Sequence, residues 1–169
     1  PWIQQTLMRH AYVRGNNQGI FFAFGGIVVS IALGKHWPYG SDFLEPFRIA
    51  LDQTMKSYFA SDGGTYEGMG YATGSLQQAL AGYALYARYR DVPLESIVPD
   101  VAVRSVDYIT AMLSTKSPLG SVIKHSDGGR EGICVTQGSL GLLARLSDDP
   151  AVPALLAGVK NHVRPNYSP

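Results

Sequence analysis

The stretch Ser61-Asp62-Gly63-Gly64-Thr65-Tyr66-Glu67-Gly68 stands immediately before a long apolar segment with helical periodicity. A near copy, Ser126-Asp127-Gly128-Gly129-Arg130-Glu131-Gly132, stands before another such segment. A third helical segment begins at Arg14-Gly15-Asn16-Asn17-Gln18-Gly19. Each successive pair of starts is separated by one helix that runs back the other way, so we expect all three starts on one face of the molecule.

This arrangement would bring together polar side chains that are distant in the chain, among them Asn17, Tyr71 and His125. The start of a helix also presents free backbone N–H groups and the positive end of the helix dipole, both of which favour an anion. Polar groups that converge at one end of a helical array are typical of a sugar-binding or catalytic cleft.

Composition narrows the class of protein. The chain has 169 residues, of which 46% are hydrophobic and 16% charged, enough for one globular domain with a substantial core. A net charge of +1 and the lack of any run of Lys and Arg argue against a nucleic-acid partner. The most apolar segment, residues 20–33, is too short to cross a bilayer, so we expect no membrane partner.

Metal and cofactor chemistry is not indicated. The single Cys134 can form neither an internal disulfide nor a Cys-rich metal site. The residues His10, His36 and His162 show no ligand spacing, so we expect neither a metal nor a cofactor. The chain opens at Pro1 within a helical pattern and without an initiator Met, which suggests a piece of a longer polypeptide.

Helical periodicity recurs in nearly every segment and strict two-residue alternation is scarce, so the chain is predicted to be all-α and a single domain over residues 1–169. Asp42 and Glu45 have the spacing of a capping box. Short loops favour antiparallel hairpins. Because loop lengths are unequal and no fixed period covers the chain, we expect part of an incomplete α/α toroid rather than a solenoid, with an inner ring of helices that begin near Asn17, Gly70 and Gly132. The expected helices span residues 1–13, 17–35, 42–60, 70–90, 101–114, 132–147 and 151–162.

Several glycines fall inside the expected helices. A glycine in a helix interior costs about 1 kcal/mol relative to alanine, so close contact with another helix is the expected compensation. This prediction covers Gly19, Gly25, Gly26, Gly74, Gly82, Gly138 and Gly141.

Three segments together resemble the signatures of the heparinase II/III-like polysaccharide lyases, a family that includes alginate and oligoalginate lyases. These are Asn16-Asn17-Gln18-Gly19, then Asp62-Gly63-Gly64-Thr65-Tyr66-Glu67-Gly68-Met69-Gly70-Tyr71, then His125-Ser126-Asp127-Gly128-Gly129. The middle segment is the most specific. The resemblance implies the C-terminal part of a lyase α/α toroid without its N-terminal helices and its C-terminal β-sandwich, and a secreted or periplasmic location.

The resemblance also implies roles for two residues. Asn17 would neutralise the carboxylate of a uronic acid, and Tyr71 would serve as catalytic base or acid. Gln18 departs from the pattern, because several members of the family have His there. The reaction is β-elimination, in which the proton at C5 of the uronate is removed and the resulting carbanion delocalises into the carboxylate, so hydrogen-bond donors to that carboxylate stabilise the transition state.

Further residues are expected to bind an acidic polysaccharide or oligosaccharide, the predicted partner. A phenol with a pKa of about 10 needs nearby positive charge to act as a base, which Lys124, His125 or Arg130 could supply. Glu67 is expected to brace its loop, and Asp62 and Asp127 to act as turn residues. The expected substrate-binding set is Gln18, Tyr66, Glu67, His125 and Arg130.

Other functions remain open on the sequence. Uronate epimerisation begins with the same proton abstraction. Glycoside hydrolysis on a similar toroid would use two carboxyl groups, for which Glu67 and Asp127 can be nominated. A non-catalytic carbohydrate-binding array is the third alternative, because the resembling lyases complete their site with a residue of the β-sandwich. We therefore expect these 169 residues alone to bind acidic oligosaccharide weakly and to turn it over poorly or not at all.

Overall fold

The computed structural model describes residues 15–34, 36–37, 39–112 and 137–162, and in these ranges the chain is all-α. The helix expected over residues 1–13 lies outside the described residues. No helix in the described ranges is long and apolar enough to span a membrane. In chain order the helices are α3 (Asn17–Leu33), α4 (Gly40–Tyr58), α5 (Met69–Arg90), the short 3-10 helix η1 (Leu94–Ser96), α6 (Asp100–Ala111), α7 (Gln137–Leu146) and α8 (Ala151–His162).

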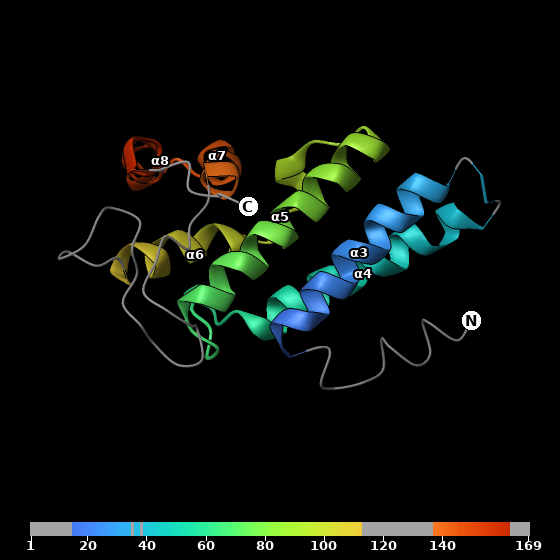
Figure 1. Ribbon diagram of the computed structural model, residues 1–169, viewed down its shortest axis with the longest axis horizontal. Helices are drawn as coiled ribbons and strands as arrows, with labels where there is room; N and C mark the ends of the chain where they lie inside the picture. The colour runs from blue at the N-terminus through green and yellow to red at the C-terminus, as the bar shows by residue number, and fades with distance from the viewer. Residues whose placement is uncertain (1–14, 35, 38, 113–136, 163–169) are drawn as a thin grey trace, which may run out of the picture.

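Helices α3 and α4 form an antiparallel hairpin, as predicted (Figure 1). The helix α3 begins after Asn16, whose side-chain Oδ1 accepts the N–H of Gly19 at 3.4 Å. This is the interaction that makes Asn a favoured N-cap. The ring of Trp37, in the turn that follows α3, stacks on the ring of Phe43 in α4, with the centroids 5.3 Å apart.

The capping box expected at Asp42 and Glu45 does not form. The helix α4 begins earlier, at Gly40, and Asp42 lies inside its first turn. The Glu45 carboxylate instead forms an ion pair of 2.7 Å with Arg48 and accepts a hydrogen bond from the Tyr86 hydroxyl on α5. A packing contact with a neighbouring helix therefore replaces the predicted local cap.

Helix α5 is the centre of the described structure, since it contacts α3, α4, α6, α7 and η1. Its buried apolar residues are Ala72, Leu76, Ala79, Leu80, Tyr83, Tyr86 and Ala87. Burial is the largest cause of a raised pKa at the Tyr83 phenol, and the neighbouring Asp52 carboxylate raises this pKa further. The Tyr83 hydroxyl donates to Asp52 at 2.8 Å, which leaves this buried phenol with a partner.

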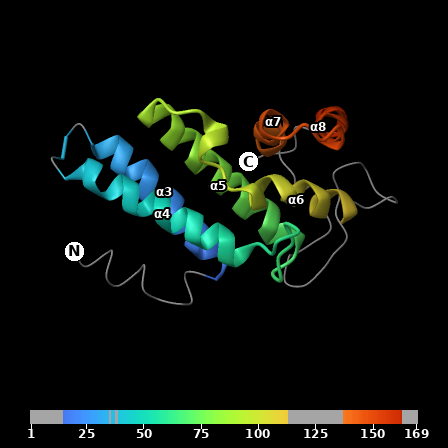
Figure 2. The same cartoon turned by 180° about the vertical axis from the view of Figure 1, so that it is seen from behind.

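Helices α3 and α5 run in the same direction and α4 runs against them (Figures 1 and 2). The two helices α7 and α8 are seen end on in both views, so they cross this direction. The expectation that the helix beginning near Gly132 runs parallel to the other two is therefore wrong for its described part, α7. The described helices pack as hairpins and do not close a ring.

The prediction for the helix glycines is correct at some positions and wrong at others. A Cβ added to Gly26 would lie 2.3 Å from the Phe47 ring of α4, and one added to Gly82 would lie 3.2 Å from Leu51. Nothing lies within 4 Å of a Cβ added at Gly25, Gly74 or Gly141. Close helix contact therefore explains Gly26 and Gly82 only among these five positions.

Candidate functional site

The starts of α3 and α5 meet at one end of the molecule. The Oε2 atom of Glu67, which lies just before α5, accepts the backbone N–H of Asn17 at 3.2 Å, although the two residues are 50 positions apart. The hydroxyl of Tyr66 donates to the backbone carbonyl of Gly15. The prediction that these two helix starts share a face is thereby confirmed.

The loop between α4 and α5 is held in place at both of its ends. Inside the loop, the Asp62 side chain accepts the N–H of Gly64 at 2.9 Å, the local turn expected for this residue. Gly63 has a φ of +83° and lies against the backbone of Ser105 in α6. Arg104 of α6 donates from Nη1 to the carbonyl of Ser61 at 3.2 Å. The loop is thus fixed on α6 at one end and on the start of α3 at the other.

The two predicted catalytic residues lie in the first turns of these two helices. Asn17 is the first residue of α3 and is half-buried, whereas its neighbour Asn16 is the N-cap. Tyr71 is the third residue of α5, and 44% of it is exposed. Gln18 is exposed as well. An amide, a second amide and a phenol therefore reach solvent from the same end of the helix pair.

Of the remaining predicted binding residues, Tyr66 and Glu67 lie in the described loop before α5. Tyr66 is 64% exposed, and its ring makes an edge contact with Tyr58 at 6.3 Å. Glu67 is half-buried and caps α3 from a distance, which agrees with the bracing role expected for it. His125 and Arg130 lie outside the described residues.

The start of α3 offers fewer free N–H groups to an anion than expected. The N–H of Asn17 is taken by Glu67, and the N–H of Gly19 is taken by Asn16. Glu67 also adds a negative charge at the positive end of the helix dipole, where a carboxylate is stabilised. An anionic ligand at this end must therefore be recognised mainly by side chains.

A buried polar cluster beneath this end was not anticipated. Tyr58 is 2% exposed and Ser75 is 0% exposed, and neither hydroxyl has a hydrogen-bond partner among the described residues. Burial raises the pKa of the Tyr58 phenol, the nearby Ser75 and Thr65 hydroxyls lower it, and the Glu67 carboxylate raises it. The Tyr58 hydroxyl lies near these groups without reaching hydrogen-bond geometry. The sequence gives no signal for this cluster, because Tyr58 occupies an ordinary apolar position of the helical pattern.

Two grooves flank the loop. The first, which we call the loop groove, has a volume of about 590 Å³. It is lined by Lys56, Ser57, Tyr58, Phe59, Ala60, Ser61, Asp62, Gly64, Thr65, Tyr66 and Tyr108. The hydroxyl of Tyr108 is buried and has no hydrogen-bond partner among the described residues. Burial raises the pKa of that phenol, and so does the nearby Asp62 carboxylate.

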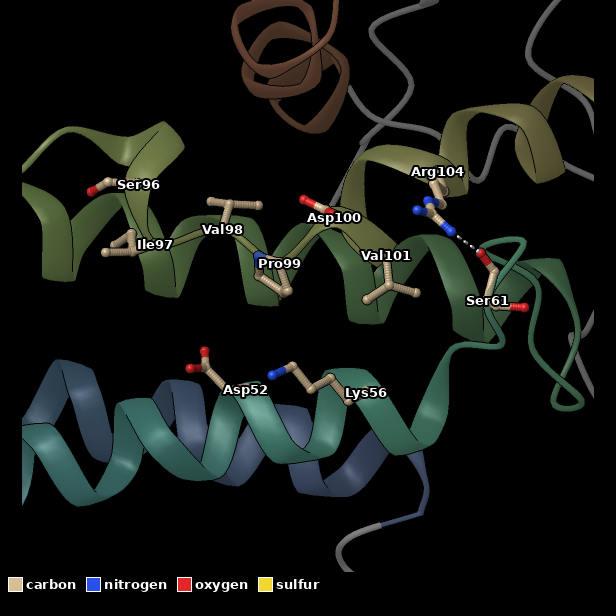
Figure 3. A pocket seen from close by; sticks show the side chains of 10 residues that line it. All are labelled: Asp52, Lys56, Ser61, Ser96, Ile97, Val98, Pro99, Asp100, Val101 and Arg104. Carbon is tan, nitrogen blue, oxygen red and sulfur yellow. Dashed lines mark hydrogen bonds between the residues drawn. The ribbon is translucent and has the colours of Figure 1, made fainter.

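The second groove lies between α4 and the segment that leads from η1 into α6, and we call it the α4–α6 groove (Figure 3). It has a volume of about 480 Å³. It is lined by Asp52, Lys56, Ser61, Ser96, Ile97, Val98, Pro99, Asp100, Val101 and Arg104. Sequence reasoning missed both grooves, because Lys56 and Arg104 are isolated basic residues on helices and form no motif.

The described ranges contain no group of three His, Cys, Asp or Glu residues that could hold a metal ion. No protein-family model, no curated protein and no solved structure matches the chain. The function must therefore be argued from the residues and their geometry.

Proposed function

We propose that the chain binds uronic-acid-containing polysaccharide and cleaves it by β-elimination, with Asn17 neutralising the uronate carboxylate and Tyr71 acting as base and then acid. The observation that carries this proposal is the junction between the two helix starts, where Glu67 bonds to Asn17 and Tyr66 bonds to Gly15. Because of this junction, an amide and a phenol from distant parts of the chain belong to the same end.

The chemistry uses these two groups in different ways. The Asn17 amide, with the exposed Gln18 amide beside it, donates hydrogen bonds to the carboxylate oxygens as charge develops on them. Donors that strengthen in the transition state lower the barrier, by about 3 kcal/mol for a well-placed group. Tyr71 removes the C5 proton and then returns a proton to the departing glycosidic oxygen.

We also propose that α3 and α5 are neighbouring inner helices of an incomplete α/α toroid, with α4 outside them. Support comes from the parallel direction of α3 and α5 and from the packing of α3 against both α4 and α5. The residues Phe21, Phe22, Val28, Val29 and Leu33 of α3 are exposed although they are apolar. A further helix of the ring, packed on that side of α3, would cover them. A β-sandwich of the same polypeptide would complete the site, and the protein would act outside the cytoplasm.

The test is a screen for the unsaturated product, which absorbs in the near ultraviolet. The chain is incubated with alginate, heparan-type and other uronate polymers, and absorbance is followed over time. We expect slow product formation that Tyr71→Phe abolishes. Tyr39→Phe is the matched control, because Tyr39 is 61% exposed and lies at the other end of the α3–α4 hairpin. Equal rates for the two variants would reject Tyr71 as the catalytic phenol, and no product from any polymer would reject elimination by these 169 residues on their own.

The alternatives give different results in the same screen. An epimerase exchanges the C5 proton with solvent and forms no unsaturated product. A glycoside hydrolase releases reducing ends without new absorbance and needs a carboxyl group free to react. The use of the Glu67 carboxylate as a cap for α3 speaks against that role.

A further inference from the structure

The α4–α6 groove has the size and the lining of a ligand site. Its volume of about 480 Å³ falls within the range of roughly 300–1,000 Å³ for small-molecule sites. In Figure 3, Asp52 and Lys56 of α4 line one side. The other side is formed by the segment from Ser96 to Arg104, whose apolar members are Ile97, Val98, Pro99 and Val101. An apolar wall opposite charged groups suits a sugar ring, which has C–H faces and polar substituents.

The charges of this groove favour an anion. The Asp52 carboxylate already accepts hydrogen bonds from Arg48 at 2.6 Å and from the Tyr83 hydroxyl at 2.8 Å. Lys56 is exposed and forms no ion pair with a described residue. Within the described residues, Arg104 forms a hydrogen bond to the neutral carbonyl of Ser61 and no ion pair. Asp100, at the start of α6, is the one carboxylate of the lining without a cationic partner in the described ranges. The lining therefore holds two available cations and one available carboxylate.

The α4–α6 groove adjoins the loop groove, because Lys56 and Ser61 line both. Tyr66 also lines the loop groove, and its hydroxyl bonds to the carbonyl of Gly15, two residues before Asn17. Neighbouring residues therefore mark a path from the start of α3, past the exposed ring of Tyr66, to Lys56 and then to Arg104.

We propose that Lys56 and Arg104 bind a second anionic group of an acidic oligosaccharide, a carboxylate or a sulfate ester, on a sugar remote from the one that reacts. This site rests on the proposed function, since it lies along the path that begins at the end of the molecule where Asn17 and Tyr71 are found. The apolar residues of the Ser96–Arg104 segment pack against the sugar ring, and the two cations set the preference for an acidic chain.

Calorimetric titration at low salt tests the site. The probes are alginate disaccharide and hexasaccharide, which carry carboxylates only, and a sulfated neutral hexasaccharide, which carries sulfates only. The variants are Lys56→Gln and Arg104→Gln. Arg88→Gln is the control, because Arg88 is exposed near the end of α5 and lines neither groove, and its substitution removes the same charge.

We expect Lys56→Gln to weaken hexasaccharide binding about threefold to fivefold, the effect of one exposed charge pair, and to leave the disaccharide unchanged. The loss should shrink as salt is added. A stronger loss with alginate identifies the anion as a carboxylate, and a stronger loss with the sulfated probe identifies a sulfate. Hexasaccharide affinities of Lys56→Gln and Arg104→Gln equal to that of Arg88→Gln would overturn the proposal.

Folding and catalysis are checked separately. Circular dichroism and thermal unfolding show whether each variant is folded, and Lys56→Gln is the decisive variant because Arg104 also holds the loop through Ser61. Lys56-dependent binding without any unsaturated product would reject the elimination and keep the groove. Product formation that depends on Tyr71, with length-dependent binding that does not depend on Lys56, would reject the groove and keep the elimination. No binding of any probe by the unaltered chain would reject both.

Discussion

The substitution Gly63→Ala tests whether the loop before α5 is fixed on α6 as the structure shows. A Cβ at this position would lie 2.4 Å from the Cα and backbone N of Ser105 and 2.6 Å from the carbonyl carbon of Arg104. These are backbone atoms of a helix, so they cannot move aside as a side chain can. The φ of +83° adds a second penalty, because an L-residue with a side chain is strained there.

Each penalty has a typical size. The left-handed backbone costs an alanine about 1–2 kcal/mol, and overpacking of a well-packed contact costs about 1–3 kcal/mol. Gly63→Ala should therefore lower the free energy of unfolding by roughly 2–5 kcal/mol. For a chain of this size, that corresponds to a fall in the melting temperature of roughly 5–15 °C.

Gly64→Ala is the matched control in the adjacent position. A Cβ there would lie 3.2 Å from Oδ1 of Asp62 and 3.3 Å from the ring of Tyr108, which are side-chain atoms that can shift. Its φ is not positive, so we expect a loss within about 1 kcal/mol. Urea unfolding followed by far-ultraviolet circular dichroism measures both variants. The docked loop would be refuted if Gly63→Ala lost no more stability than Gly64→Ala.

Two further predictions concern helix packing and pH. Gly25→Ala should stabilise the chain by up to about 1 kcal/mol, because nothing lies near its added Cβ. Gly26→Ala should destabilise the chain by about 1–3 kcal/mol, because its added Cβ clashes with the Phe47 ring. Equal effects of the two substitutions in urea unfolding would contradict the α3–α4 contact. The pKa of Glu45 lies below its ordinary value of 4.5, mainly because of the hydrogen bond from Arg48. The Glu45 carboxylate therefore stabilises the fold fully above pH 4.5, and this contribution is lost as the pH falls through the lowered pKa. Thermal unfolding should show a stability advantage over Glu45→Gln at neutral pH that disappears in acid, and an advantage that persists in acid would contradict this.

The sequence predicts the helices well because their signals are local. The helix α8 begins and ends where expected, and α3 begins at Asn17 because the side chain of Asn16 caps it. The start of α4 is misplaced by two residues for a tertiary reason. Glu45, which has the spacing of a capping residue, bonds to Arg48 in its own helix and to Tyr86 on α5.

The candidate site is only partly predictable for the same reason. The segments at the expected helix starts identify Asn17, Glu67 and Tyr71, and the contact between the first two forms once the helices pack. No sequence pattern distinguishes Gly63, which touches α6, from Gly64, which does not contact its backbone. The groove formed by Lys56 and Arg104 likewise depends on how α4 and α6 face each other, which periodicity does not encode.

Glu67 determines how an acidic polymer would be held at this site. Its carboxylate accepts the N–H of Asn17 and places a negative charge beside that residue. The hydrogen-bond donors that a uronate would contact at that end are neutral amides. Ionic attraction to the uronate must therefore come from cationic side chains at another position. Among the described residues that line the path, the cations are Lys56 and Arg104. Recognition of the polymer and reaction at one sugar would then take place at different points along the same path, which is why binding should depend on oligosaccharide length and the reaction on Tyr71.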